Sequence, residues 1–447
     1  MRRTGSRVTV LASALLWCGA AVGLLAQAQP PVRPVPATPP ATRRVAAAPV
    51  PPGIVAITNA RVLPVSGPPI ERGTVVIRGG KIVAVGANVT VPAGARVIDA
   101  TGKIVTPGWI ESSTQIGIVE IPSGAEGSDD QASTDKELSA AFNVVDSFNG
   151  DSTVIPVTRV EGITSAVVTP AGTGHAILGQ GGMFALSGLQ VPDSVVKAPV
   201  AMFANLGEAG AASEGGSRAG AMLRLREALQ DALDFSRNRA AWNSAQRRAY
   251  ARGRLDLEAL APVVRGELPL GINVNRASDL LAALRLADEF HLKLIVLGAA
   301  EGWRVATELA ASKVPVVVKP LTDIPSFDAL GATLENPARL AKAGVTLILS
   351  SFDTHNARNL RQEAGNAISY GLDRDLALRA VTLEPARAWG VADRLGSLEV
   401  GKEGDVVVWS GDPFELTTRA EHVFIAGREM PEDTRQKQLF EKYRVIR

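Results

Sequence analysis

A carboxylate and an imidazole, those of Asp353 and His355, stand two positions apart in the segment LILSSFDTH, directly after a strand-like apolar run. A histidine beside an acid can accept and release protons near neutral pH, so the pair is a candidate for acid–base catalysis without a metal ion. A structural role for His355 fits the sequence equally well. Both residues are therefore candidates only.

A second set of polar residues lies in TPGWIESSTQIGI, at the end of a β-patterned segment, and includes Ser113 and Gln115. Hydroxyl and amide groups donate and accept hydrogen bonds, but they suit hard cations only when several carboxylates accompany them. Ser113 is a weak candidate for a nucleophile, and the segment GGMFALSG lacks the G-x-S-x-G turn that exposes a catalytic serine. The segment therefore predicts a polar pocket rather than a nucleophile.

The other three of the four histidines have simpler explanations. His291 follows a helical pattern, which predicts a helix end or a surface position, and His422 lies in the last β-patterned segment. His175 stands in a glycine-rich loop, where it would either be solvated or line a pocket mouth. Cys18 is the single cysteine and lies in the apolar N-terminal segment, so the rest of the chain has no thiol for catalysis, disulfides or zinc binding.

The first 28 residues have the pattern of a secretory signal peptide: three arginines, an apolar run over residues 8–26, and a small-x-small triplet ending at Ala28. A transmembrane anchor is the alternative, because the apolar run is nearly long enough to span a bilayer. Residues 29–52 are rich in Pro and Ala and are expected to form an extended linker. We therefore expect a periplasmic or secreted protein.

The charge balance excludes several classes of partner. The formal net charge is +2, and removal of the three signal-peptide arginines leaves 44 basic against 45 acidic residues, a charge of −1. Neither value predicts binding to nucleic acid or to an anionic membrane. We expect a small polar ligand, no stable membrane insertion after signal cleavage, and a homo-oligomer as one possible assembly.

The two ends of the chain after the linker share one pattern. Residues 53–107 and 395–430 show short β-branched strands with a period of two, including a Gly79-Gly80 pair suited to a tight hairpin turn. We expect these ends to build one small composite β-sandwich, followed by a tail over residues 431–447.

The middle of the chain, residues 108–394, alternates strand-like runs such as LKLIVLG and VPVVVKP with helical patterns. In one of the helices, Met222, Leu225, Leu229 and Leu233 share a face. Strand–helix alternation of this length predicts a parallel sheet, and the number of repeats favours a (β/α)₈ TIM-type barrel. The expected fold class is therefore α/β, a barrel joined to the composite sandwich.

One helical stretch of the middle part is unusually basic. Residues 224–260 carry many arginines and, as far as the sequence indicates, few acids to pair with them. We expect an exposed insertion over the barrel mouth, which either grips an anionic ligand or forms a solvated face.

Several segments resemble the amidohydrolase superfamily, and within it the imidazolonepropionase-like members. They include VIDATGKIVTPGWIESS and GSLEVGKEGDVVVWSGDP, and the likeness covers nearly all of residues 53–430. The most diagnostic positions are Pro107, Gly108, Thr382, Pro385, Ala386, Gly401, Lys402, Asp405 and Trp409. The resemblance implies a barrel that carries one or two divalent metals such as zinc, and hydrolysis of amide-like C–N bonds.

At the positions where the resemblance implies metal ligands, this chain has other residues. The first strand of such a barrel ends in D-x-H-x-H, but here Glu111, Ser113 and Gln115 stand there. The fifth strand carries H-x-H, replaced by Asn273 and Asn275. These serine, glutamine and asparagine side chains keep hydrogen-bonding capacity but lose the imidazole nitrogens that hold zinc.

Two further strand ends complete the comparison with the family pattern. The sixth strand, which should end in a histidine, has Gly298, whereas the eighth strand keeps an acid in Asp353. A hydrolytic zinc site needs about three protein ligands and an open position. We therefore expect no tightly bound metal cofactor.

Two functions remain open from the sequence. By resemblance the protein is a hydrolase of C–N bonds other than peptide bonds, with catalysis impaired or altered because the usual metal ligands are replaced. The alternative is a non-catalytic periplasmic binding protein for a small polar or peptide-like ligand. In both cases Ser113, Gln115, Asn273, Asn275 and Asp353 are expected to converge at the C-terminal mouth of the barrel.

Overall fold

The computed structural model describes residues 53–120, 129–135, 138–172 and 174–444. The predicted signal peptide (1–28) and linker (29–52) lie outside these residues. None of the helices in the described ranges combines the length and the apolar character needed to cross a membrane.

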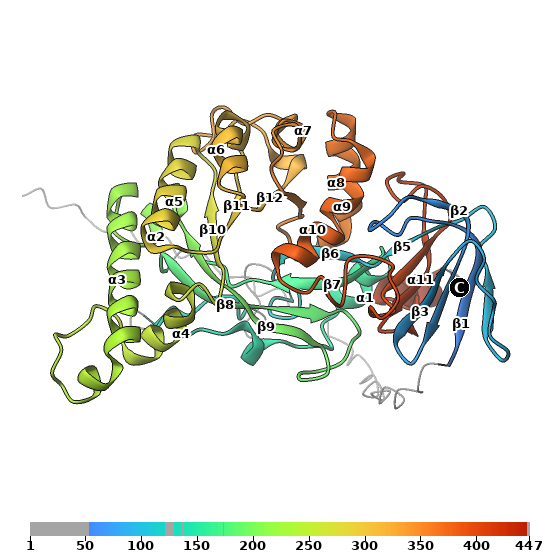
Figure 1. Cartoon of the computed structure of the whole chain (residues 1–447), viewed down its shortest axis with the longest axis horizontal. Coiled ribbons are helices and arrows are strands. Elements are labelled where there is room, and N and C mark those ends of the chain that lie inside the picture. Colours follow the sequence, from blue (N-terminus) through green and yellow to red (C-terminus); the bar gives the residue numbers. More distant parts are fainter. Residues whose placement is uncertain (1–52, 121–128, 136–137, 173, 445–447) are drawn as a thin grey trace, which may run out of the picture. The chain divides into compact units, whose positions relative to one another are not determined.

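One eight-stranded sheet combines both ends of the chain (Figure 1). Its strands are β1 (Val55–Val62), β2 (Ile70–Arg78), β3 (Lys81–Gly86), β4 (Arg96–Asp99), β5 (Ile104–Pro107), β14 (Val406–Trp409), β15 (Ala420–Ile425) and β16 (Arg428–Glu429). The order is β16-β15-β14-β5-β1-β2-β3, and β4 pairs with β1 beside β5. The two ends meet where β5 and β14 pair antiparallel.

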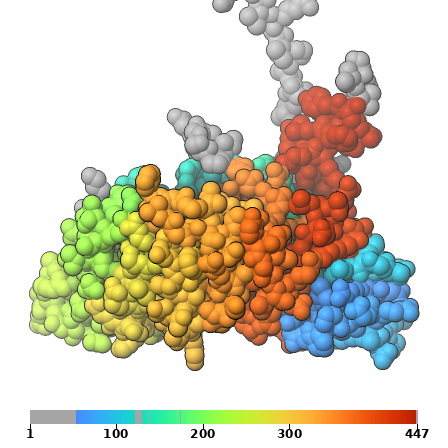
Figure 2. Space-filling model, turned by 90° about the horizontal axis from the view of Figure 1, so that it is seen from above, coloured from blue at the N-terminus to red at the C-terminus, as the bar shows by residue number. Residues whose placement is uncertain are grey.

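Local sequence explains the turns and the core of this sheet. Gly79 and Gly80 both have positive φ angles, as the predicted tight turn between β2 and β3 requires. Alternating apolar residues, among them Ile57, Ile77 and Phe424, form a buried cluster of their own. In the space-filling view the N-terminal strands (blue) adjoin C-terminal residues (orange to red), in agreement with the pairing of β5 and β14 (Figure 2).

The second eight-stranded sheet is a nearly closed barrel, so the expected α/β barrel is confirmed. Its strands follow one another in chain order: β6 (Trp109–Thr114), β7 (Ile163–Val168), β8 (Ile177–Ala185), β9 (Val195–Asn205), β10 (Leu270–Val274), β11 (Leu294–Gly298), β12 (Val316–Val318) and β13 (Leu347–Leu349). Side chains such as Ile110, Val167, Phe203 and Leu297 form one buried cluster with Trp389.

The prediction of a purely parallel sheet is wrong at β8. This strand runs antiparallel to both β7 and β9, so two hairpin connections stand where strand–helix alternation would place crossover helices. The glycine-rich segment that begins β8 allows close packing: a Cβ atom on Gly181 would lie 2.4 Å from the ring of Phe203. Because glycine-rich sequence is typical of loops, periodicity alone did not predict a strand there.

In the view of Figure 1 most helices lie above the barrel sheet or at its left end, and β8 and β9 form its lower side. The α-helices are α1 (Val154–Arg159), α2 (Gly207–Ser213), α3 (Arg218–Asn243), α4 (Arg254–Val264), α5 (Ala277–Phe290), α6 (Ala306–Ala311), α7 (Asn336–Lys342), α8 (Leu360–Ser369), α9 (Arg374–Ala380), α10 (Leu383–Ala388) and α11 (Arg435–Tyr443). Short 3₁₀ turns are η1 (Val144–Ser147), η2 (Gly302–Val305), η3 (Pro320–Thr322) and η4 (Ala357–Asn359). The predicted face of α3 packs inward, with Leu225 and Leu229 buried and Met222 and Leu233 partly buried.

The basic stretch 224–260 differs from its prediction in two ways. Most of it forms α3 and α4, and the inner face of α3 belongs to the main buried cluster rather than to an exposed insertion. Its arginines also have acidic partners, some of them distant in sequence. Examples are the pairs Arg226–Glu289, Arg239–Glu258, Arg248–Asp231 and Arg252–Glu214. Acids that the fold brings close could not be paired with these arginines from the linear sequence.

Candidate functional site

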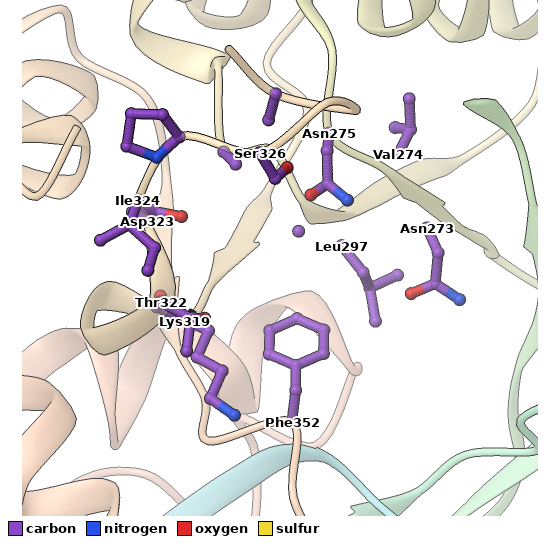
Figure 3. A pocket seen from close by; sticks show the side chains of 14 residues that line it. Asn273, Val274, Asn275, Leu297, Lys319, Thr322, Asp323, Ile324, Ser326 and Phe352 are labelled. Atoms are coloured by element: carbon purple, nitrogen blue, oxygen red, sulfur yellow. Dashed lines mark hydrogen bonds between the residues drawn. The ribbon is translucent and has the colours of Figure 1, made fainter. Parts of the chain in front are cut away.

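A cavity of about 400 Å³ opens at the C-terminal ends of β10, β11 and β12, where barrel proteins gather their functional side chains. Asn273 and Asn275 line it from the end of β10, and Lys319 and Asp323 from the segment after β12 (Figure 3). Phe352, which follows β13, lies at its lower edge in that view and also packs against the cluster inside the barrel.

The two asparagines extend into this cavity but have partners of their own (Figure 3). The Asn273 side-chain amide donates a hydrogen bond to Oδ1 of Asn205, at 2.9 Å. The amide of Asn275 donates to Asp328 Oδ2 at 3.4 Å. Each bond uses a donor, so the carbonyl oxygen of Asn273 is left to accept a hydrogen bond from a ligand.

Gly298, at the sixth strand end, is sterically tied to Asn275. Its φ angle is +94°, a conformation that residues with side chains rarely adopt. A Cβ atom at this position would also lie only 2.5 Å from Oδ1 of Asn275. A histidine at position 298 is therefore incompatible with the present arrangement of Asn275.

Asp323 is the most perturbed acid of the cavity and was not predicted from the sequence. The residue is only 3% exposed, and its carboxyl group accepts a hydrogen bond from Asn336 Nδ2 at 2.7 Å. Burial raises the pKa of Asp323 to about 8, against the effect of that hydrogen bond, and the neighbouring Glu363 carboxyl raises it further. The Asp323 carboxyl group therefore holds its proton at neutral pH.

Lys319 was also missed, although a signal for it exists. It directly follows the apolar run that forms β12, and residues after barrel strands face the mouth. The same rule would have suggested the segment around Asp323. Neither residue stands at a strand end where the resemblance implies a metal ligand.

Glu111 lies in β6 and is completely buried, outside the cavity lining. It accepts hydrogen bonds from the Ser350 hydroxyl, from the backbone N–H of Ser351 at 3.1 Å, and from the backbone N–H of Ser113 at 3.2 Å. Burial raises the pKa of Glu111 to about 7, in opposition to these hydrogen bonds. The carboxylate is thus held by neighbouring serines.

Ser113 and Gln115 share one partner close to Glu111. The hydroxyl of Ser113 lies 3.3 Å from that of Thr169, and the Gln115 amide donates to the same hydroxyl at 3.1 Å. Thr354 in turn donates to the carbonyl oxygen of Gln115 at 3.3 Å. These polar groups satisfy one another between β6, β7 and the segment after β13.

Asp353 and His355 do not contact each other through their polar atoms. The Asp353 carboxylate accepts from the backbone N–H of Asn356 at 2.9 Å and so stabilises the turn that begins η4. Nε2 of His355 lies 2.6 Å from the carbonyl oxygen of Glu120. Both side chains have local structural contacts, and neither lines the cavity.

The predicted polar residues therefore form two groups. Ser113 and Gln115 lie with the backbone of Asp353, whose carbonyl oxygen accepts from Thr114. Asn273 and Asn275 belong to the cavity and bond to other partners. A ligand in this cavity would meet the asparagines rather than the whole predicted set.

The donor chemistry at the strand ends does not fit a catalytic divalent ion. Among the described residues, no group of three or more His, Cys, Asp or Glu side chains is placed to hold a metal. Glu111 accepts hydrogen bonds from serine and backbone donors, and Gly298 offers no side chain that could bind a metal. Neutral amides and hydroxyls do not replace the missing nitrogen ligands of zinc.

Comparisons with known proteins agree with this architecture. The model of the amidohydrolase family matches residues 304–432. The crystal structure of an amidohydrolase from Thermotoga maritima MSB8 is similar, with a TM-score of 0.77 and 28% identity, covering 84% of this chain and 99% of that one.

Two curated relatives point to the same family. The amidohydrolase tasK of Hapsidospora irregularis is 24% identical over 388 residues, which are 80% of this chain but 39% of the relative, so the match spans about two fifths of that protein's length. The imidazolonepropionase of Erwinia tasmaniensis is 44% identical over 62 residues, 14% of each chain. In its barrel fold and in these sequence matches, the chain is similar to members of the amidohydrolase superfamily.

Proposed function

We propose that this protein is a diverged amidohydrolase whose barrel mouth binds a small polar ligand and whose chemistry no longer depends on a strand-held metal ion. The observation that carries the proposal is Gly298 at the sixth strand end, which has no side chain to bind a metal and whose φ angle of +94° disfavours other residues. A Cβ atom on Gly298 would also lie 2.5 Å from Oδ1 of Asn275, so a side chain at this position would require Asn275 to move.

The second support is the state of the first strand. Metal-activated hydrolysis requires an ion that lowers the pKa of its bound water to near neutrality, held by about three protein ligands. Glu111 accepts hydrogen bonds from Ser350 and from two backbone N–H groups, and these donors compete with a cation for the carboxylate oxygens. The arrangement favours a stable hydrogen-bonded group over a metal ligand.

Hydrolysis of C–N bonds other than peptide bonds is the second candidate function, and the names of the relatives favour it. Within this chain, Asp323 is the group best suited to such chemistry, because its burial keeps it protonated near neutral pH. A protonated carboxyl group in a cavity can act as a general acid toward a leaving nitrogen.

Metal analysis combined with ligand binding tests the proposal. We expect far less than one zinc, manganese or iron ion per chain after purification in metal-supplemented medium. In a thermal-shift screen of uncharged amides and dipeptides, stabilisation by a ligand should be independent of added divalent ions. It should be lost in Asn273→Leu and retained in Asn88→Ala, which changes an exposed residue of the sandwich. Stoichiometric metal with metal-dependent turnover would overturn the proposal.

Export is a separate proposal and rests on the signal-peptide pattern of residues 1–28. We propose that the mature protein is periplasmic or secreted and begins near residue 29. Cell fractionation followed by N-terminal sequencing would test this. Recovery of the intact N-terminus in the membrane fraction would support the anchor alternative instead.

A further inference from the structure

Lys319 is the cation of the cavity, and nothing in the described residues pairs with it directly. Its side chain is half-buried, lines the cavity and extends beside the ring of Phe352 (Figure 3). It has no hydrogen bond and no ion pair with another described side chain. The amino group is therefore available to a ligand.

Glu363 is the acid whose pKa Lys319 lowers, and its carboxyl group does not fully neutralise the lysine charge. Lys319 lowers the pKa of Glu363, but burial dominates and raises that pKa to about 7, so the carboxyl is only partly ionised at neutral pH. Glu363 itself is 2% exposed and accepts a hydrogen bond from the backbone N–H of Leu321 at 2.8 Å. A bound anion would stabilise a half-buried ammonium group that lacks a full counter-charge, because charge-assisted hydrogen bonds are stronger than hydrogen bonds between neutral groups.

The remaining lining defines what else the anion would carry. Leu297, Ile324 and Phe352 offer apolar contacts on the walls of the cavity. The carbonyl oxygen of Asn273 can accept a hydrogen bond, as its amide is used by Asn205. Asp323 is protonated at neutral pH and does not repel an anion.

We propose that the ligand of this cavity is a small carboxylate with an adjacent apolar group, in which Lys319 binds the carboxylate and Phe352 and Ile324 contact the apolar part. The inference rests on the proposed function and names its ligand class. A monoanion fits better than a phosphate, because Lys319 is the one cationic side chain among the residues that line the cavity.

A pair of matched probes tests the charge directly. N-acetyl-L-leucine carries a carboxylate, and N-acetyl-L-leucinamide has the same shape without the charge. By isothermal titration calorimetry on the full chain, the acid should bind at least about tenfold more tightly than the amide, the scale of one charge-assisted hydrogen bond. In Lys319→Met this preference should disappear, while affinity for the amide stays the same.

Lys342→Met is the matched control, because Lys342 is exposed on α7 and does not line the cavity. It should keep the full preference for the acid, and thermal melts should show that both variants are folded. Equal binding of acid and amide by the unmodified chain, no measurable binding of either probe, or an undiminished preference in Lys319→Met would each overturn the inference. The proposed function would still stand if uncharged ligands of the thermal-shift screen bind with dependence on Asn273.

Discussion

The hydroxyl of Ser350 donates a hydrogen bond to the carboxylate of Glu111, and this bond links the end of the last barrel strand to the first. The sheet order runs from β6 to β13 without a ladder between these two strands, so side-chain contacts complete the ring there. Glu111 also accepts from the backbone N–H of Ser351. Glu111, which stands where the family pattern has a metal-associated acid, thus helps to join the first and last strands of the barrel in this chain.

We predict that Glu111→Ala lowers the free energy of unfolding by about 2–4 kcal/mol. The change leaves the Ser350 hydroxyl and buried backbone N–H groups without an acceptor, each of which costs about 1–3 kcal/mol. Chemical denaturation would measure the loss. Glu335→Ala is the control, since Glu335 forms an exposed pair with Arg339 and should cost less than about 1 kcal/mol. Equal losses for the two variants would contradict a closing role for Glu111.

A second prediction concerns the loop over residues 323–331, which forms part of the cavity rim. Arg218 donates to Asp328 of this loop at 2.8 Å and to Asp279 of α5 at 3.0 Å. Arg218→Met should raise amide hydrogen exchange in this loop about tenfold, because a partly buried ion pair that holds it is removed. Hydrogen-exchange mass spectrometry would measure the effect.

The control for the loop prediction is Arg226→Met on the same helix. Arg226 pairs with Glu289 on a more exposed surface, and no hydrogen bond or ion pair joins its side chain to a described residue of the loop. Exchange in residues 323–331 should be unchanged in this variant. Gly331 remains bonded to Glu301 and Trp303 in both variants, so an overall loss of the fold is not expected. A tenfold rise in both variants, or in neither, would show that Arg218 does not hold the loop.

A third prediction addresses Asp353, whose carboxylate accepts from the backbone N–H of Asn356. Asp353→Asn keeps an acceptor oxygen and should change the free energy of unfolding by less than about 0.5 kcal/mol, whereas Asp353→Ala should cost about 1 kcal/mol through the lost hydrogen bond to Asn356. Neither should alter ligand binding in the cavity, since Asp353 does not line it. Loss of ligand binding in Asp353→Asn would contradict this prediction and show that Asp353 belongs to the ligand site.

Most of the architecture could be predicted because it follows from regular patterns. Period-two strands predicted that the two ends of the chain form β-structure, which the structure shows as one shared sheet. Apolar runs that alternate with amphipathic helices, such as the one with Leu225 and Leu229 on its inner face, predicted the barrel. The antiparallel strand β8 was not predicted, because its glycines allow close packing against Phe203. Such a tertiary contact leaves no periodic pattern in the sequence.

Of the residues that line the cavity, Asn273 and Asn275 were predicted from the sequence, whereas Lys319 and Asp323 were not, and the grouping of the predicted residues was not foreseen. Ser113 and Asn273 both stand at strand ends of one barrel, yet their hydrogen bonds run to different neighbours. Side-chain partners depend on rotamers and on loops such as 323–331, which the linear pattern does not encode. Asp323 shows this most clearly, because its raised pKa comes from burial that only the folded chain creates.

The last prediction is a fall in stability with rising pH, caused by buried acids. Burial raises the pKa of Asp323 to about 8 and that of Glu363 and Asp405 to about 7, whereas exposed acids titrate near 4. Between these values the folded chain holds protons that the unfolded chain has released. The stabilisation is therefore complete below about pH 4 and is lost as the pH rises toward about 8.

Asp323→Asn isolates the contribution of one of these acids, because asparagine keeps an acceptor for Asn336 but cannot titrate. Between pH 5 and 7 each such proton contributes a slope of about −1.4 kcal/mol per pH unit to the free energy of unfolding. We expect the variant to lose about that much of the slope, measured by denaturant titrations at several pH values. Asp288→Asn, at an exposed position of α5, should keep the original slope. If Asp323→Asn retained the full slope, the Asp323 carboxyl would not be the buried, protonated group of this cavity.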